Sequence, residues 1–202
     1  LHHPTPGIPL QTLEDQTHPA WQRLKIEELL AQQLSQTQAR LEREALKAAV
    51  LNPKKGDLAK RLLAQLPFAL TRAQARAVAE ITQDLAKPSP MHRLLQGDVG
   101  SGKTVVAAMA AAICMDSGYQ CVLMAPTEIL AQQHFENFKD RFANWPVRVE
   151  VLSRFISAKA QKAILADVAN GKVDILIGTH KLLQDDIRLP DLGLLIVDEE
   201  HR

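Results

Sequence analysis

The sequence predicts an α/β domain in which helices cover both faces of a mostly parallel sheet, preceded by a long helix. From residue 58 onward, short apolar runs alternate with helical stretches, and this alternation is typical of parallel sheets. A glycine-rich segment follows one apolar run, and the chain before residue 56 has apolar residues at helical spacing. We therefore expect a lead-in and a long helix over residues 1–56, and the α/β domain over residues 57–202.

The first 56 residues are expected to form an extended segment and one long helix. Residues 1–16 contain three prolines and Gly7, so we expect them to be extended and not helical. Thr17-His18-Pro19 is typical of a helix start, because proline is tolerated in the first turn. The apolar stripe of this helix consists of Ile26, Leu30, Leu34, Leu41, Ala45 and Ala49. A break near residues 35–37 is an open alternative, and residues 52–56 are expected to end the helix.

The remaining chain is expected to alternate strands with helices. The expected strands are residues 93–96, 121–125, 147–152, 174–177 and 194–198. The expected helices are residues 71–86, 103–116, 127–142 and 158–169. Gly118 and Gly171 stand where glycine commonly ends a helix.

The composition indicates a globular protein. Apolar residues make up 46% of the 202 residues, and the formal net charge of +1 argues neither for nor against a nucleic-acid partner. No apolar run has the length of a membrane span and no signal peptide is present, so we expect no membrane partner. Cys114 and Cys121 lack metal-ligand spacing, and we expect both to be core residues of a cytoplasmic protein. Because the chain begins with Leu1 and stops directly after an expected strand, we also expect it to be part of a longer protein.

A phosphate-binding loop is the strongest chemical signal in the sequence. The pattern G-x-x-x-x-G-K-[ST] is matched by Gly97, Asp98, Val99, Gly100, Ser101, Gly102, Lys103 and Thr104. Glycines let successive backbone N–H groups point at phosphate oxygens, and the start of the following helix adds positive charge. Lys103 would contact the β- and γ-phosphates of ATP, and the hydroxyl of Thr104 would bind Mg²⁺. A glycine-rich turn without a ligand is the alternative.

Acidic residues at the end of the last expected strand form a second candidate element. Asp198 and Glu199 follow an apolar run, at the carboxyl edge where ligands bind in open α/β sheets. Asp198 would hold Mg²⁺, directly or through water, and Glu199 would polarise the water that attacks the γ-phosphate. Surface carboxylates at a strand end are the alternative, but a P-loop upstream favours the catalytic interpretation.

These two motifs together resemble the superfamily-two helicases of the DExH type. The second motif reads Asp198-Glu199-Glu200-His201 in this chain. The resemblance implies a RecA-like P-loop NTPase domain that uses ATP and Mg²⁺. It also implies that His201 couples the nucleotide to nucleic acid, and a plain surface position is the alternative for this residue.

A segment upstream of the P-loop resembles the helicase motif whose glutamine reads the edge of adenine. This segment runs from Phe68 to Gln74, and both of these residues are therefore candidate nucleotide contacts. A glutamine amide can both donate to adenine and accept from it. An exposed helix residue is the alternative for Gln74.

Two strand-to-helix turns resemble helicase motifs that lie on the DNA-tracking face in the family. Residues 125–128 resemble motif Ia, and residues 178–180 resemble motif Ib. Such turns expose hydroxyl and N–H groups that suit backbone phosphates. The candidate DNA contacts are Thr127, Thr179 and His180. An ordinary turn with a helix cap is the alternative for both segments.

The chain resembles two helicase families in different places. Residues 91–104 and 123–138, together with the lead-in and residues 17–21, are similar to RecG, the branched-DNA helicase. Residues 140–202 are closer to Mfd, the transcription-repair coupling translocase, and Glu200 stands where RecG usually has glutamine. The start of the chain favours RecG, because Mfd precedes its motor with an RNA-polymerase-binding module that is not seen here.

The resemblance to RecG implies ATP-driven movement along double-stranded DNA that remodels stalled forks and Holliday junctions during recombination and repair. It also implies that residues 1–56 link an upstream wedge domain to the motor. In the family, a second RecA-like domain of the same chain supplies an arginine finger, so we expect these 202 residues alone to bind ATP but not to unwind DNA. RNA polymerase is a partner only under the Mfd alternative. A non-hydrolysing nucleotide- or DNA-binding module is the alternative from another class.

Overall fold

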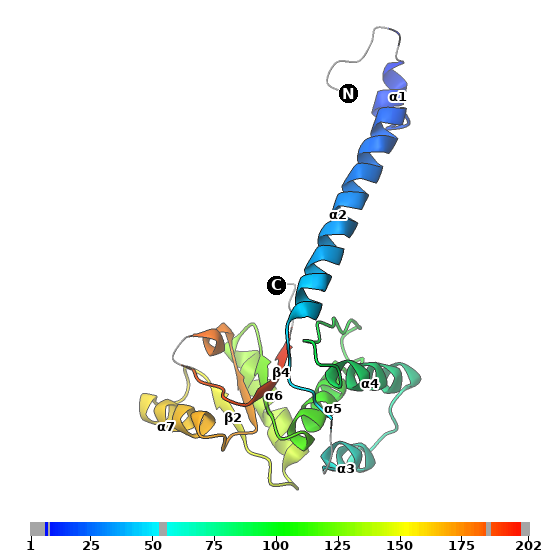
Figure 1. The fold of residues 1–202 in the computed structure, drawn as a ribbon. Coiled ribbons are helices and arrows are strands. Elements are labelled where there is room, and N and C mark those ends of the chain that lie inside the picture. Colours follow the sequence, from blue (N-terminus) through cyan, green and yellow to red (C-terminus); the bar gives the residue numbers. More distant parts are fainter. Residues whose placement is uncertain (1–6, 8, 53–55, 185–186, 199–202) are drawn as a thin grey trace. The chain divides into compact units, whose positions relative to one another are not determined.

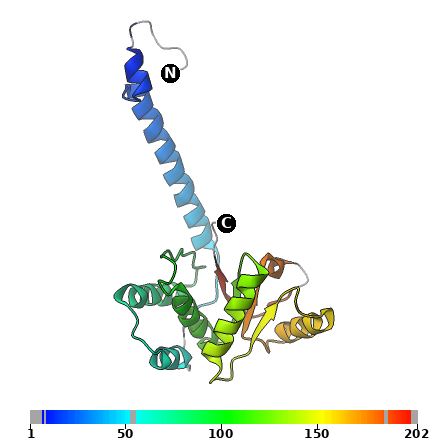
Figure 2. The same cartoon turned by 180° about the vertical axis from the view of Figure 1, so that it is seen from behind.

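The computed structural model describes residues 7, 9–52, 56–184 and 187–198. The chain divides into two compact units, Leu1–Lys47 and Ala48–Arg202, and each is described by itself. Among the described residues, the first unit contains two helices, and the second contains a sheet with helices around it (Figure 1). Figure 2 shows the same elements from behind.

The first unit consists of α1 (Leu10–Glu14) and α2 (Pro19–Ala45). The expected start of the long helix is confirmed, because Pro19 is its first residue. The ring nitrogen Nδ1 of His18 accepts a hydrogen bond from the backbone N–H of Ala20 at 3.1 Å, which satisfies one of the N–H groups that a helix start leaves without a partner. The helix has 27 residues and none of them is buried.

Two expectations for the first unit are wrong. The N-terminal lead-in is not entirely extended, because α1 begins directly after the last proline; the carbonyl of Pro9 accepts hydrogen bonds from the Thr12 N–H at 3.0 Å and from its hydroxyl at 2.7 Å. Proline is compatible with a helix start, where its missing N–H costs nothing. There is also no break near residues 35–37, since the hydroxyl of Thr37 donates to the Gln33 carbonyl at 2.7 Å within the helix.

The long helix also ends earlier than expected, at Ala45 and not at residues 52–56. In the second unit, the backbone N–H of Leu51 donates to the carbonyl of Leu85 at 2.9 Å, at the end of α4 (Arg72–Leu85). The Leu51 side chain is 1% exposed. In a continuing helix, the Leu51 N–H would instead donate to the carbonyl four residues earlier. Its bond to Leu85 is therefore incompatible with a helix that continues to residue 52.

The second unit is built on a four-stranded sheet in the order β2-β3-β1-β4, and every pair among these described strands is parallel. The strands are β1 (Gln120–Met124), β2 (Val149–Leu152), β3 (Ile175–Gly178) and β4 (Leu192–Val197). The expected parallel sheet is confirmed, with strand bounds that differ by one or two residues. Met124 at the end of β1 is in register with Gly178 and with Val197, so the central strand and both its neighbours end at one edge.

Helices cover both faces of this sheet, as the sequence predicts. The helices of the second unit are α3 (Leu58–Gln65), α4, α5 (Lys103–Asp116), α6 (Glu128–Phe142), α7 (Ala158–Ala169) and the short 3₁₀ helix η1 (His180–Leu183). Leu123 and Ile177 point into the cluster that contains residues of α5 and α6. Val122 and Leu176 point into the cluster that contains residues of α7 and η1. The alternation follows from the strand period of two.

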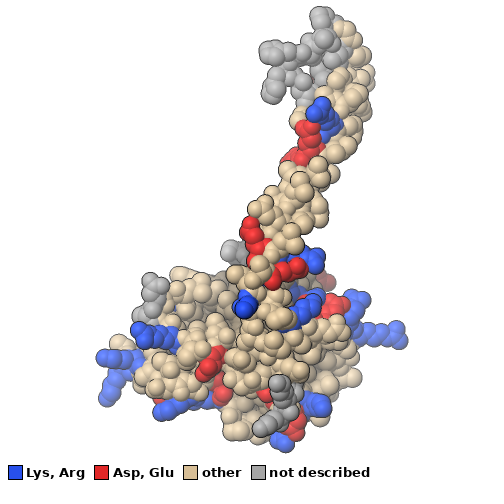
Figure 3. Space-filling view, in the orientation of Figure 1, with Lys and Arg blue, Asp and Glu red and all other residues tan. Residues whose placement is uncertain are grey.

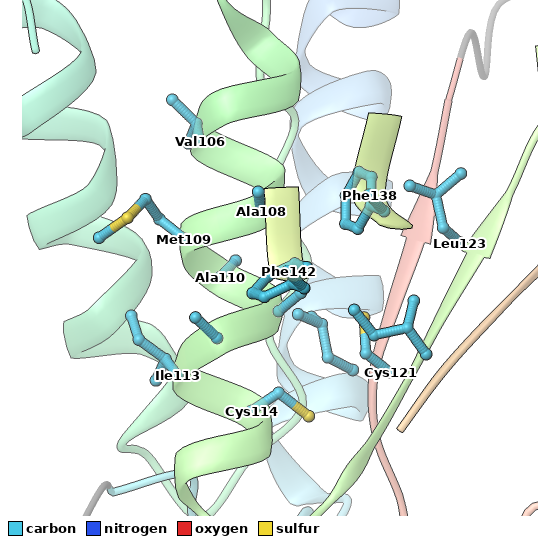
Figure 4. Packing of buried hydrophobic residues seen from close by; sticks show 14 of the residues in the cluster. Val106, Ala108, Met109, Ala110, Ile113, Cys114, Cys121, Leu123, Phe138 and Phe142 are labelled. Carbon is cyan, nitrogen blue, oxygen red and sulfur yellow. The ribbon is translucent and has the colours of Figure 1, made fainter. Parts of the chain in front are cut away.

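The main core forms where α5 packs between the sheet and the neighbouring helices (Figure 4). Ala108, Ala111 and Ala112 are completely buried, and such small side chains let neighbouring elements approach the helix closely. Phe138 and Phe142 of α6 fill the space beside them, with their ring centroids 6.1 Å apart. A helix that is apolar on every side belongs in a protein interior, and α5 is therefore the structural centre of this unit.

The ends of α5 and α7 match the expectation for glycine. Gly118 and Gly171 follow these helices with φ values of 84° and 68°, in the left-handed region that only glycine adopts freely. In contrast, α3 is a helix that the sequence analysis does not predict. Its first N–H groups, those of Leu58 and Ala59, are both capped at 3.1 Å by the carboxylate of Asp116 from the end of α5.

The expected strand at residues 93–96 is not formed. Arg93 instead pairs with Glu80 at 2.7 Å and with Asp84 at 2.6 Å, both on α4. The Leu94 side chain is 73% exposed, whereas an inner strand of a parallel sheet would bury both of its faces. The strand is expected because of a short apolar run. The ion pairs of Arg93 instead hold this segment against α4.

The two cysteines provide a test of the core. Both are buried and free, as expected, and burial raises the pKa of the Cys114 thiol to about 12 and that of Cys121 well above its ordinary value. Because the thiolate is the reactive form, we expect the native chain near pH 8 to react with Ellman's reagent roughly a hundredfold more slowly than the denatured chain. Equal rates before and after addition of guanidinium chloride would contradict this burial.

Candidate nucleotide site and the adjoining strand ends

The phosphate-binding pattern folds as a turn that leads directly into α5. Gly100 and Gly102 have φ values of 79° and 81°, in the region that favours glycine. The Ser101 N–H donates to the carbonyl of Asp98 at 3.1 Å and narrows the turn. Gly102 is the N-cap of α5 and provides no side-chain cap. The positive end of the helix therefore faces the turn, which is the arrangement that binds phosphate at helix starts.

Lys103 lies over the beginning of this turn. Its Nζ donates to the carbonyls of Gly97 at 2.6 Å and Asp98 at 3.0 Å. A lysine ammonium is a mobile cation with three donors, so it can exchange these carbonyls for phosphate oxygens without a change in the backbone. The side chain of Val99 at the tip of the turn is fully exposed.

Gln74 connects the start of α4 to the phosphate-binding turn. Its side-chain oxygen accepts from the Thr71 N–H at 2.9 Å, while the Thr71 hydroxyl accepts from the Gln74 N–H at 3.2 Å. The amide nitrogen of Gln74 donates to the Ser101 carbonyl at 2.8 Å. The side chain is thus engaged on both sides and is not simply an exposed helix residue. Reading of adenine by Gln74 stays a prediction, as does the contact of Phe68, whose side chain is 49% exposed.

Asp198 lies directly after β4, at the edge where the strands end. Its N–H donates to the carbonyl of Met124 at 2.8 Å and extends the pairing of β4 with β1. One carboxylate oxygen, Oδ2, lies 2.7 Å from Nε2 of His134, a residue of α6 that the sequence analysis does not single out. Helical spacing on α6 could not have revealed this contact, because the partner is 64 residues away. Glu199 and His201 lie outside the described residues.

The available oxygen groups fit Mg²⁺ bound together with a nucleotide. Among the described residues, no group of three or more His, Cys, Asp or Glu side chains could hold a metal on its own. Magnesium does not need such a cage, because it commonly binds one or two carboxylates, phosphate oxygens and water. The Thr104 hydroxyl in the first turn of α5 and the Asp198 carboxylate are hard oxygen ligands of this kind.

The two turns that resemble DNA-contacting motifs differ in their local structure. Thr127 is the N-cap of α6, and its hydroxyl accepts from the Leu130 N–H at 3.2 Å. Thr179 is buried, and its hydroxyl has no hydrogen-bond partner among the described residues. His180, directly after it, is exposed. The cap at Thr127 is the structure of an ordinary turn, although its hydroxyl can still donate to a phosphate. The DNA contacts of Thr127, Thr179 and His180 stay predictions.

Glu128, the last residue of the segment that resembles motif Ia, contacts the turns that follow β2 and β3, although the sequence assigned it no role. One carboxylate oxygen accepts from the backbone N–H of Arg154, after β2, at 3.2 Å. The other lies 3.5 Å from Nζ of Lys181, on η1. The side chain of Glu128 is 14% exposed, so water screens these contacts less than at the open surface. One residue at the start of α6 therefore links the turns that follow β2 and β3.

On the face of the molecule that Figure 3 shows, surface charge does not mark a binding site. In the view of Figure 3, lysine, arginine, aspartate and glutamate side chains are scattered over the second unit and form no uniform basic patch. None of the described helices is long and apolar enough to span a membrane. The site is thus defined by the P-loop and by the carboxyl edge of the sheet.

Comparison with known families agrees with this geometry. Residues 71–202 match the family model "DEAD/DEAH box helicase". The matched region begins at the N-cap of α4 and contains the P-loop and Asp198. The chain belongs to the DEAD/DEAH box helicase family.

Two individual relatives show which kinds of helicase and translocase the chain is similar to. The chain is 49% identical over its full 202 residues to the ATP-dependent DNA helicase RecG of Pasteurella multocida (strain Pm70), and it covers 29% of that protein. It is 60% identical over 136 residues to the transcription-repair-coupling factor of Escherichia coli (strain K12), which is 67% of this chain and 12% of that protein. The resemblance to both families is confirmed, and the chain spans less than a third of the length of these relatives.

A solved structure of RecG bound to a three-way DNA junction is similar to the chain in fold as well as in sequence. The match has a TM-score of 0.81 and 41% sequence identity, and it covers 90% of this chain and 25% of that chain. The expected RecA-like α/β fold is therefore confirmed.

The glycine at the helix start offers a test of the loop. We expect Gly102→Ala to weaken binding of ADP roughly tenfold or more, because alanine disfavours the φ of 81° at the start of α5 and its methyl group would push the amide of Gln74 away from the Ser101 carbonyl. Isothermal titration calorimetry measures the effect. Gly118→Ala is a matched control, since Gly118 also has a positive φ but has open space around it. Both variants should lose about 1–2 kcal/mol of stability, and unchanged ADP binding in Gly102→Ala would contradict the loop assignment.

Proposed function

We propose that this chain is the ATP-binding part of a DNA helicase or translocase that acts on branched DNA, such as stalled forks and Holliday junctions. The observation that carries the proposal is a P-loop that opens α5 in a chain 49% identical over 202 residues to a RecG protein. A RecG structure of the same fold is bound to a three-way DNA junction, which supports branched DNA as the substrate class.

In this proposal, the nucleotide phosphates bind where residues 97–104 turn into α5. Backbone N–H groups and the helix start hold the phosphate oxygens, and Lys103 exchanges its carbonyl partners for the β- and γ-phosphates. Thr104 and Asp198 hold Mg²⁺, which when bound neutralises phosphate charge. Glu199 polarises the attacking water.

Two further contacts complete the proposed nucleotide site. Phe68 and Gln74 contact the adenine, and the bond from Gln74 to the Ser101 carbonyl keeps the adenine-contacting segment close to the P-loop. His201 couples the nucleotide to nucleic acid. These roles rest on the resemblance of the motifs and on the position of α4 beside the turn.

DNA is proposed to bind along the edge where β1 and β3 end. Thr127 and His180 are exposed at this edge, and Thr179 lies between β3 and His180. Phosphate contacts of this kind position a protein on DNA without reading its sequence. A second RecA-like domain in the same protein would complete the ATP site from the other side, and residues 1–56 would link the motor to a wedge domain.

The strongest alternative is a polymerase-coupled translocase, because the identity to the transcription-repair-coupling factor is 60% over 136 residues. This alternative predicts that the complete protein binds RNA polymerase, whereas the RecG-like proposal predicts preferential binding to forked DNA. A pull-down with polymerase and a competition between forked and linear duplexes separate the two.

Removal of the P-loop ammonium tests the motor assignment. In a protein that contains this chain and its second motor domain, we expect Lys103→Ala to reduce ATP hydrolysis and unwinding of forked DNA by roughly a hundredfold or more, because the cation on the transferred phosphate is lost. Lys159→Ala on the exposed surface of α7 is a matched control. Substantial hydrolysis and unwinding in the first variant would refute the P-loop assignment.

The 202 residues by themselves should bind ATP weakly and hydrolyse it very slowly, because the arginine finger comes from the second domain in this proposal. A DNA-stimulated ATPase assay on the chain, compared with the two-domain protein, tests this. Turnover of the isolated chain at the rate of the larger protein would show that the ATP site is complete without a second domain. The non-hydrolysing module is tested separately, by calorimetry of nucleotide binding with and without Mg²⁺. Binding that Mg²⁺ does not strengthen would favour that alternative.

A further inference from the structure

A histidine outside all the expected motifs lies against the candidate metal ligand. Nε2 of His134 is 2.7 Å from Oδ2 of Asp198, and the two side chains are 16% and 31% exposed. An ionised carboxylate can only accept hydrogen bonds, so Nε2 carries the hydrogen in either charge state of the ring. The contact is therefore a charge-assisted hydrogen bond that does not depend on protonation of the histidine.

Both partners of this bond are held in place by other parts of the fold. On α6, Ala131 and Phe138 lie three residues before and four residues after His134, hence on the same helix face, and both are completely buried in the core. The backbone of Asp198 is held by its bond to the Met124 carbonyl. The freedom that remains to Asp198 is rotation of its side chain, and among the described residues only His134 donates to its carboxylate.

We propose that His134 is a positioning residue: it takes one oxygen of Asp198 and fixes the orientation in which the other meets Mg²⁺. This inference rests on the proposed function of the P-loop and Asp198. Magnesium requires near-octahedral geometry and tolerates misplaced ligands poorly. Hydrogen bonds to the ligands of a metal commonly set their orientation, and their loss lowers metal affinity.

A merely structural role for the bond predicts something different. The core side chains already hold α6, so a purely structural bond would act only through the stability of the fold. A structural bond would therefore change melting while leaving the dependence of nucleotide binding on Mg²⁺ intact. A positioning bond would change that dependence and leave nucleotide binding without metal almost unchanged.

The experiment measures binding of the non-hydrolysable ATP analogue AMPPNP to the full 202-residue chain by calorimetry, with MgCl₂ and with EDTA. His134→Phe keeps a ring of similar size and removes the donor, and His134→Gln retains an N–H near the position of Nε2. Gln133→Ala, an exposed neighbour on the same helix, is the control. Circular dichroism melting of every variant reports on folding.

Mg²⁺ is expected to strengthen AMPPNP binding by a certain factor in the unchanged chain. We expect His134→Phe to reduce that factor by roughly tenfold, which is the effect of one charge-assisted hydrogen bond. AMPPNP affinity in EDTA should stay close to that of the unchanged chain. His134→Gln should recover most of the Mg²⁺ effect, and Gln133→Ala should retain all of it.

The outcomes distinguish this inference from the proposed function. If the unchanged chain binds no AMPPNP, or binds it equally well in MgCl₂ and in EDTA, the proposed metal-nucleotide site is wrong. The proposed role of His134 is then overturned as well. If the unchanged chain shows the Mg²⁺ effect and His134→Phe retains it, only the positioning role is overturned. Equal losses in MgCl₂ and in EDTA, or no recovery in His134→Gln, would also overturn it.

Discussion

The parallel pairing of the central strand β1 is the constraint on which the rest of the second unit depends. Its hydrogen bonds to β3 and β4 bring three strand ends to one edge, and parallel strands can achieve this only through long crossover connections. Thr127, Thr179 and Asp198 follow these three strands in the chain. The shared edge is thus a consequence of strand direction, and it gathers residues that are as much as 71 positions apart in the chain.

The P-loop depends on the same core through α5. This helix is buried on nearly all sides, so its first turn, where the phosphate-binding loop ends, has little freedom to move. Gln74 adds a hydrogen bond from α4 to the turn itself. On the other side, α6 carries both Thr127 at its start and His134, which contacts Asp198. Helices that are anchored in the apolar core therefore carry a site whose own groups remain partly exposed and available to ligands.

Much of this arrangement could be predicted from local patterns. The bounds of α5 and α7 follow from apolar content and from the glycines after them, because a left-handed residue at a helix end is a local requirement. The parallel sheet follows from the alternation of elements. The phosphate-binding loop is also a local signal, since Gly100 and Gly102 supply the positive φ values of the turn within one short segment. Chemistry contained in a few consecutive residues can be recognised without a fold.

The sequence by itself therefore determined the class of fold, the P-loop and the carboxylate at the end of β4. Only the tertiary structure decided which residues support them. Asp116 caps α3, the backbone N–H of Leu51 binds the Leu85 carbonyl where a helix is expected, and Arg93 binds α4 where a strand is expected. His134 contacts Asp198 because α6 follows β1, and β4, which leads to Asp198, is the neighbour of β1 in the sheet. Each of these contacts joins groups that are far apart in the sequence or depends on burial, and no periodicity or short motif encodes such a distance.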